Sequence, residues 1–141
     1  SANDNVDITH ATFATANINA GKITANVVAN TITFTNGHRT TNTYTTAASV
    51  TPVSVDSFST STYRSAKYQA QMTAGTNYQA IELLVIHDGT TANLVQYADV
   101  VTSTSLGTFD ASITTGVLRL LFTPATATAT TIKLIRDTIN V

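Results

Sequence analysis

An apolar residue recurs every five positions near the start of the chain, and this spacing most constrains what the chain can fold into. A period of five matches neither an amphipathic helix, which repeats near 3.6 residues, nor a strand, which repeats every two. It suits a chain that winds and turns one bulky side chain inward at each step. The recurring residues are Ile8, Phe13, Ile18, Ile23 and Val28. We therefore expect residues 1–34 to form an intertwined β-stem.

A stem this short cannot bury its apolar stripe alone, because repeat units need neighbours to form a continuous core. The neighbours that we expect are copies of the same chain. We predict a homotrimer in which Ile8, Phe13, Ile18, Ile23 and Val28 of all copies form the stem core.

The composition argues against several function classes. Only 11% of the residues are charged and the net charge is −1, compared with roughly 25% charged residues in typical soluble domains. About one residue in five is Thr, which is β-branched and suits a pleated surface. No dense basic cluster is present, so we expect no nucleic-acid partner. The longest apolar run, at residues 81–86, contains Glu82 and is too short to cross a bilayer. We expect no membrane insertion.

Two further regions follow the repeat. Residues 35–54 lack a strong apolar pattern and contain the turn signal Asn36-Gly37, so we expect a connector that could still donate a strand. Residues 55–141 contain longer apolar runs separated by turns, which predicts an all-β head. The turn spacing favours antiparallel neighbours in a β-sandwich or jelly-roll-like barrel.

The head is expected to contain several strands and no helix, since no long stretch holds a 3.6-residue period with caps. Residues 63–73 alternate and place Tyr68 on the inward face. The expected strands occupy residues 63–73, 78–87, 94–101, 109–113, 117–123 and 131–139.

Histidines and carboxylates offer few candidate sites. His10, His38 and His87 show no ligand spacing. His10 could form an axial metal or anion site in a threefold assembly, but a surface or hydrogen-bonded histidine is the favoured interpretation. We therefore expect no metal and no cofactor.

None of the acidic residues is interpreted as catalytic. Asp88-Gly89 is interpreted as a turn and not as a calcium loop, because too few oxygen ligands follow it. Glu82 and Asp110 could be a glycosidase pair, but nothing in the sequence brings them together. Ser and Thr are so abundant that an apparent catalytic triad is expected by chance. We predict that the chain is not an enzyme.

Two tyrosines are candidates for contact with a glycan or a protein partner. An exposed tyrosine presents a flat amphipathic ring that can stack on a sugar, although most tyrosines in a small β-domain line the core. Tyr63 and Tyr97 are the candidates because they are expected at strand ends or faces. Arg64, Arg119 and Arg136 are expected to pair with carboxylates across strands or subunits.

The sequence resembles proteins of bacteriophage particles. The repeat with its pairs AT before Phe13, AN before Ile18 and GK before Ile23 resembles intertwined β-stems of tail fibres and tail-tip proteins. Residues 57–139 resemble a repeated module of phage virion structural proteins, notably those of marine cyanobacteria. The lines that carry this second resemblance are SFSTSTYRSAKYQAQMTAG, YQAIELLVIHDGTTANLVQYADV, LGTFDASI and VLRLLFTPATATATTIKLIRDTI.

The resemblance implies a β-sandwich module on a homotrimeric virion appendage, assembled in the host cytoplasm, and it implies no catalytic residue. The function expected is that of a trimeric tail fibre or related appendage whose head contacts a host surface glycan or another virion protein. The alternatives are a carbohydrate-binding module and a capsid decoration protein. A depolymerase is least favoured, because such spikes need a long catalytic solenoid.

Overall fold

A computed structural model describes residues 17–19, 22–24, 32–34 and 37–141 of the chain. Within these residues every regular element is a β-strand and every strand pairing is antiparallel. The prediction of an all-β chain is confirmed for this part of the protein. No helix of these residues is long and apolar enough to span a membrane.

The strands alternate with short turns along most of the chain. They are β1 Asn17–Asn19, β2 Lys22–Thr24, β3 Ile32–Phe34, β4 Gly37–Thr45, β5 Val53–Ser59, β6 Tyr63–Ala74, β7 Asn77–His87, β8 Ala92–Val101, β9 Gly107–Thr114, β10 Val117–Pro124 and β11 Thr131–Asn140. Each of the six strands that we expected in the head is present. Their ends extend one or two residues beyond the expected bounds, or coincide with them.

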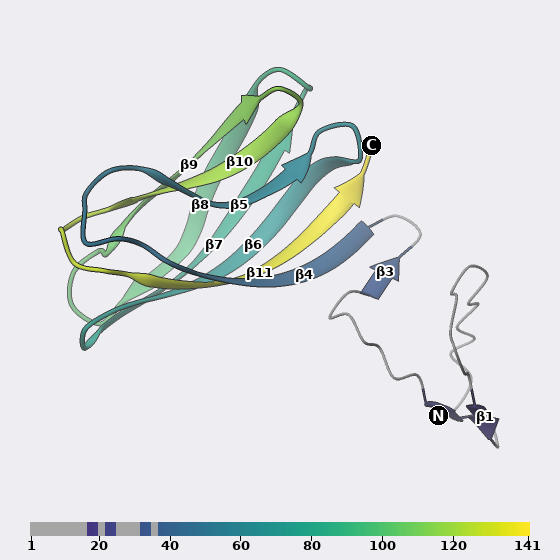
Figure 1. The fold of residues 1–141 in the computed structure, drawn as a ribbon, viewed down its shortest axis with the longest axis horizontal. Coiled ribbons are helices and arrows are strands. Elements are labelled where there is room, and N and C mark those ends of the chain that lie inside the picture. Colours follow the sequence, from purple (N-terminus) through teal and green to yellow (C-terminus); the bar gives the residue numbers. More distant parts are fainter. Residues whose placement is uncertain (1–16, 20–21, 25–31, 35–36) are drawn as a thin grey trace.

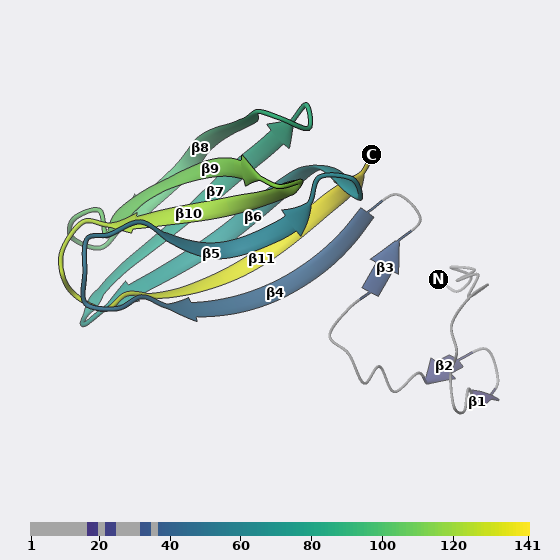
Figure 2. The same ribbon diagram turned by 45° about the horizontal axis from the view of Figure 1, so that its top comes forward.

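The strands form two layers, with one short separate hairpin (Figures 1 and 2). The larger sheet has the order β3-β4-β11-β6-β7-β8, and the smaller has the order β5-β10-β9. The last strand, β11, lies between β4 and β6, so the middle of the larger sheet joins segments far apart in sequence. The smaller sheet lies across one face of the larger one, and the core lies between them.

The alternation of β6 and β7 sets which side chains enter the core. Successive side chains of a strand point to opposite faces, and in β6 every second residue from Ala66 to Ala74 is buried. Tyr68 is fully buried, as its place on the inward face predicted. The β6–β7 turn contains Gly75 with φ 59°, a left-handed conformation that glycine adopts without steric cost.

The core draws on both layers. The larger sheet contributes Tyr68, Met72, Leu83 and Ile132, and the smaller sheet contributes Leu118, Leu120 and Phe122; all are fully buried. Gly107 begins β9 and lies close to β10, its neighbour in the smaller sheet. A Cβ atom at this position would collide with the Phe122 ring and with the carbonyl oxygen of Thr123.

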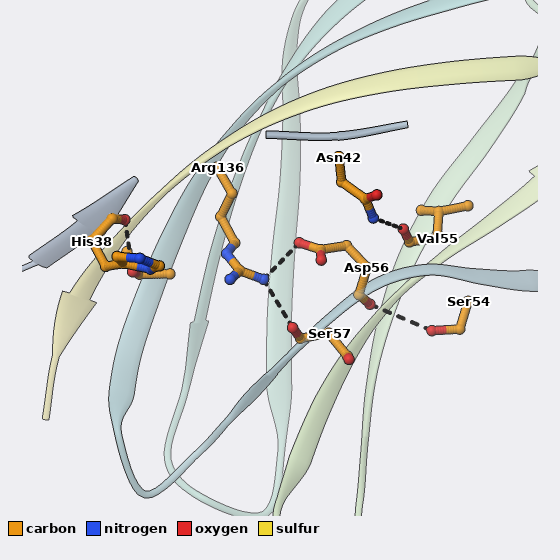
Figure 3. A network of polar contacts seen from close by, with 8 residues as sticks. His38, Asn42, Ser54, Val55, Asp56, Ser57 and Arg136 are labelled. Atoms are coloured by element: carbon orange, nitrogen blue, oxygen red, sulfur yellow. Dashed lines mark hydrogen bonds and ion pairs between the residues drawn. The ribbon is translucent and has the colours of Figure 1, made fainter. Parts of the chain in front are cut away.

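A charged pair lies inside this apolar interface (Figure 3). Arg136 on β11 donates through Nη1 to Asp56 Oδ2 at 2.7 Å and to the Ser57 carbonyl at 2.8 Å, both on β5. The two charged side chains are only 9% and 13% exposed. Burial raises the pKa of the neighbouring Tyr68 phenol well above its usual range, and the Asp56 carboxylate adds to the effect. The pair therefore ties the two layers together at a buried point.

Side-chain amides join the sheets at both long edges. Asn42 on β4 donates to the Val55 carbonyl of β5 at 3.0 Å (Figure 3). At the opposite edge, the Phe109 amide of β9 donates to Gln96 Oε1 of β8, also at 3.0 Å. Buried Gln79 accepts from the Leu106 amide at 2.7 Å. The two layers share no ladder of backbone hydrogen bonds here, so these side chains satisfy the backbone groups instead.

Two residues of the predicted stem core are described only as backbone. Ile18 and Ile23 are partners in the antiparallel pair β1–β2, within one chain. Ile8, Phe13 and Val28 lie outside the described residues. The trimeric stem over residues 1–34 stays a prediction.

The segment expected to be a connector takes part in the larger sheet. Strand β4, within residues 35–54, pairs with β11 along its whole length. Because β3 pairs with β4, the described part of the sheet begins at Ile32, although the apolar texture of the sequence changes only near residue 55. The division into stem, connector and head at 34, 54 and 55 remains a prediction about domains.

Candidate functional site

The face of the larger sheet that points away from the core is the candidate site, and we call it the outer face. Antiparallel pairing places its side chains in rows across β4, β11, β6, β7 and β8. One row reads Thr41, Ile135, Gln69, Glu82 and Tyr97, and the next reads Arg39, Asp137, Lys67, Leu84 and Val95. Directly opposed side chains in such rows lie close enough to interact.

Two ion pairs occupy the middle of the outer face. Arg39 Nε and Nη2 contact Asp137 Oδ1 and Oδ2 at 2.5 and 2.6 Å, a two-bond geometry in which the planar guanidinium matches the carboxylate. Lys67 Nζ lies 3.0 Å from Glu82 Oε2. The hydrogen bonds from Arg39 and from Lys67 lower the pKa values of Asp137 and Glu82, respectively, below their ordinary range. Both carboxylates therefore remain charged at neutral pH, and the two positive charges balance the two negative ones.

These four side chains, with Gln69 and Ile135, line a shallow depression. The depression is open to solvent and its polar groups already bond one another. Surface ion pairs of this kind stabilise a protein by no more than about 1 kcal/mol each. Their main consequence here is electrical: the centre of the outer face carries no net charge.

Exposed apolar side chains cover the part of the outer face nearest the β8 edge of the sheet. We call this group the β7–β8 patch; it consists of Leu84, Ile86, Val95, Tyr97 and Val100. Their exposed fractions range from 39% for Tyr97 to 68% for Val100. Leu84 stands directly opposite Val95 in the ladder, so the patch is continuous across the two strands. Contiguous apolar surface of this kind marks interaction sites in soluble proteins.

The structure separates the two candidate tyrosines. Tyr97 lies on the outer face opposite Glu82, with Lys67 Nζ 6.0 Å from its ring centroid. Tyr63 packs partly buried against the core instead. Its ring stacks on His38 at 6.0 Å and meets the edge of Phe58 at 6.1 Å. Of the two candidates, Tyr97 alone lies on the outer face.

The histidines serve local packing in the described part of the chain. His87 is buried, and its Nε2 lies 2.7 Å from the Tyr63 carbonyl oxygen. His38 stacks on the same tyrosine. No three His, Cys, Asp or Glu side chains converge among residues 17–19, 22–24, 32–34 and 37–141. His10, the candidate axial ligand, lies outside these residues.

The acidic candidates lie apart. Glu82 is on β7 of the larger sheet, whereas Asp110 is on β9 of the smaller sheet and accepts a bond from the Ala111 amide. Asp88 Oδ1 accepts from the amides of Thr91 and Thr90 at 2.7 and 2.8 Å, which closes the β7–β8 turn. These bonds, led by that of Thr91, lower the pKa of Asp88 to about 2. The turn interpretation of Asp88-Gly89 is confirmed.

Sequence reasoning missed the β7–β8 patch, although a signal for it exists. Apart from Glu82, the run at residues 81–86 is apolar on both faces of the strand. Such a pattern is typical of a strand that is covered on both sides, so it signals an outward apolar surface that needs a cover. In the structure the smaller sheet covers only the inward side, so Leu84 and Ile86 remain exposed.

Comparison with known proteins gave similarity to solved structures alone. No protein-family model matches the chain. No curated protein matches it either. The solved structures to which it is similar include a tailspike of Acinetobacter baumannii bacteriophage Fri1, a capsular polysaccharide depolymerase. The TM-score is 0.47 at 13% identity, over 77% of this chain and 19% of that one.

Two further Acinetobacter phage tailspikes share the likeness. For the tailspike of Acinetobacter baumannii phage AM24 the TM-score is 0.41 at 9% identity, over 72% of this chain and 26% of that one. For the tailspike of Acinetobacter phage vB_ApiP_P1 it is 0.42 at 21% identity, over 84% and 24%. The chain thus spans about a fifth to a quarter of the length of these tailspikes. At such scores the likeness transfers no function to this protein.

One prediction is nevertheless corrected by the comparison. The sequence led us to predict that the chain is not an enzyme. The Fri1 tailspike, to part of which the chain is similar, is a capsular polysaccharide depolymerase. The exclusion of enzymatic activity is therefore overturned. Its reasoning considered only residues within the chain, whereas the chain matches only part of a longer protein.

Proposed function

We propose that this chain is a structural subunit of a bacteriophage tail appendage whose head contacts the host surface or another virion protein. The proposal includes a homotrimer held by the residue 1–34 stem, a two-layered β-sandwich head, and assembly into the virion in the host cytoplasm. The sequence lines that resemble virion modules, including those of cyanobacterial phages, point the same way.

The observation that carries this proposal is the outer face of the larger sheet. It is broad, its four central charges are paired with one another, and five of its exposed apolar side chains lie together on β7 and β8. Such a surface suits an assembled part better than a freely diffusing monomer, because burial against a partner removes apolar area from water.

The test is the mass of the full chain in solution, measured by light scattering during size-exclusion chromatography. We expect the mass of three chains. In the Ile18→Asp variant a buried carboxylate would replace an apolar residue of the stem core, so the trimer should dissociate. Circular dichroism should show unchanged β-structure in the head. A trimeric Ile18→Asp protein would contradict the stem.

A carbohydrate-binding module is the second candidate function, and exposed Tyr97 favours it. The ring lies beside the polar depression, where a sugar could stack on the ring and bond to Gln69 or to the charged groups. Calorimetric titration with host polysaccharide should then show binding that Tyr97→Ala abolishes. Tyr63→Ala is a poor control because Tyr63 packs against the core; Tyr78→Ala, at another exposed tyrosine, is the better one.

A further inference from the structure

We propose that the β7–β8 patch is a contact between copies of this chain, additional to the stem. This inference rests on the proposed function in one respect, namely that the chain forms a trimer. The patch residues are Leu84, Ile86, Val95, Tyr97 and Val100. The proposed contact is a subunit interface in the head itself, which the residue pattern did not predict.

The chemistry of the patch favours a protein partner over a sugar. Four of its five side chains are aliphatic, and only Tyr97 carries a polar atom. A sugar needs several hydrogen-bonding groups, which aliphatic side chains do not supply. A protein–protein interface instead combines uncharged apolar side chains with surrounding polar groups, and the patch with its neighbours has this composition.

The charge arrangement allows the partner to be a second copy. Arg39 is paired with Asp137 and Lys67 with Glu82, so the polar region beside the patch has no net charge. The whole chain carries a net charge of only −1. Where the patches of neighbouring copies meet in the trimer, the adjacent ion pairs bring balanced charge, whereas like-charge contacts would cost several kcal/mol. Lys133, also on the outer face, lies on β11, which β6 separates from the patch strands.

The size of the outer face also suits this partner. Strands about 4.8 Å apart with a rise of about 3.3 Å per residue give five strands of roughly ten residues an area on the order of 800 Å². A standard interface buries about 800 Å² on each partner. In an interface of that size the patch supplies the apolar part, along β7 and β8, and the ion-paired side chains and the threonines of β4 and β11 supply a polar part beside it.

A stem would make even a weak contact effective. Copies joined at one end meet at an effective concentration in the millimolar range when the linkage is short. The patch therefore need not hold free chains together. It has only to be buried in the trimer, and burial can be measured directly.

The experiment uses the absence of cysteine from the chain. A single cysteine is introduced in the full chain at the patch, as Val95→Cys, and a matched one at exposed Thr108 on the outer side of β9, as Thr108→Cys. Each variant is labelled with a maleimide in its native state and again after unfolding in urea. The native-to-unfolded rate ratio removes differences in intrinsic thiol reactivity. Light scattering gives the mass of each variant.

We expect both variants to be trimers. Relative to the unfolded state, native labelling of Val95→Cys should be slowed at least tenfold more than native labelling of Thr108→Cys. Equal ratios in a trimer would overturn the patch interface and leave the proposed trimer intact. A monomeric full chain would overturn both, and the mass identifies that case. Protection of Val95→Cys that appears only after host polysaccharide is added would assign the patch to a glycan and also overturn the inference.

Discussion

Replacing Arg136 with Met should be among the most destabilising single changes in the head. Arg136 donates to Asp56 at 2.7 Å and to the Ser57 carbonyl at 2.8 Å, in a position where both charged side chains are nearly excluded from water. The change leaves the Asp56 carboxylate buried without its cation. It also removes the contact between the guanidinium and the Phe58 ring, 5.5 Å away.

The magnitude follows from the burial. Removing one partner of a buried ion pair costs about 3–5 kcal/mol of stability, because the remaining charge stays buried without hydration and without an opposite charge. Replacing both partners with apolar residues of similar volume is often neutral. We therefore expect Arg136→Met to lower the free energy of unfolding by about 3–5 kcal/mol. The double variant Arg136→Met/Asp56→Leu should recover most of that loss.

Urea unfolding followed by circular dichroism measures these free energies, because the chain has no Trp for fluorescence. All variants are compared at one protein concentration, since association would shift the midpoint. Arg39→Met at the exposed pair is the control and should cost far less than Arg136→Met, because water screens an exposed ion pair. A loss at Arg136 as small as that of the control would refute the reasoning. So would a double variant no more stable than the single one.

Further changes test the turns and the close contact of β9 with β10. Gly107→Ala should lower the thermal midpoint through overpacking against Phe122, at a cost of about 1–3 kcal/mol; an unchanged midpoint would contradict the close approach. Gly75→Ala, which meets open space but has a positive φ, should cost about 1 kcal/mol. The carboxyl of Asp88 should titrate near pH 2 by NMR, because amide bonds hold its pKa at about 2. A depressed pKa means that the carboxylate's contribution to stability is complete above the pKa of an unfolded Asp and is lost as the pH falls through about 2. Asp88→Asn should lack this titration; an ordinary pKa in the wild-type chain would argue against the turn bonds.

The strands of the head could be predicted from the sequence for a local reason. In β6 and β7 every second side chain is buried, so the order of apolar and polar residues shows which side chains face inward. Gly75 and Asp88 mark the turns between the strands. The prediction needed only neighbours along the chain. It therefore located β6 to β11 and the inward position of Tyr68, but it did not predict β5.

The partners of Arg136 could not be found in this way. The sequence predicted that Arg136 would meet a carboxylate across strands or subunits, but Asp56 lies 80 residues away on the other layer. Their meeting depends on β11 inserting between β4 and β6 while β5 joins the opposite sheet. No local pattern specifies that arrangement, because it follows from how two complete sheets pack.

The sequence by itself thus determined the all-β class, the strands β6 to β11 and the turns between them, since these depend on side-chain period and backbone preference over a few residues. Only the tertiary structure decided that Leu84 and Ile86 stay exposed while Leu83 and Val85 are buried. The residue order makes both faces of β7 apolar, and the second layer covers just one of them. Which face is left for a partner is therefore a property of the packed sheets.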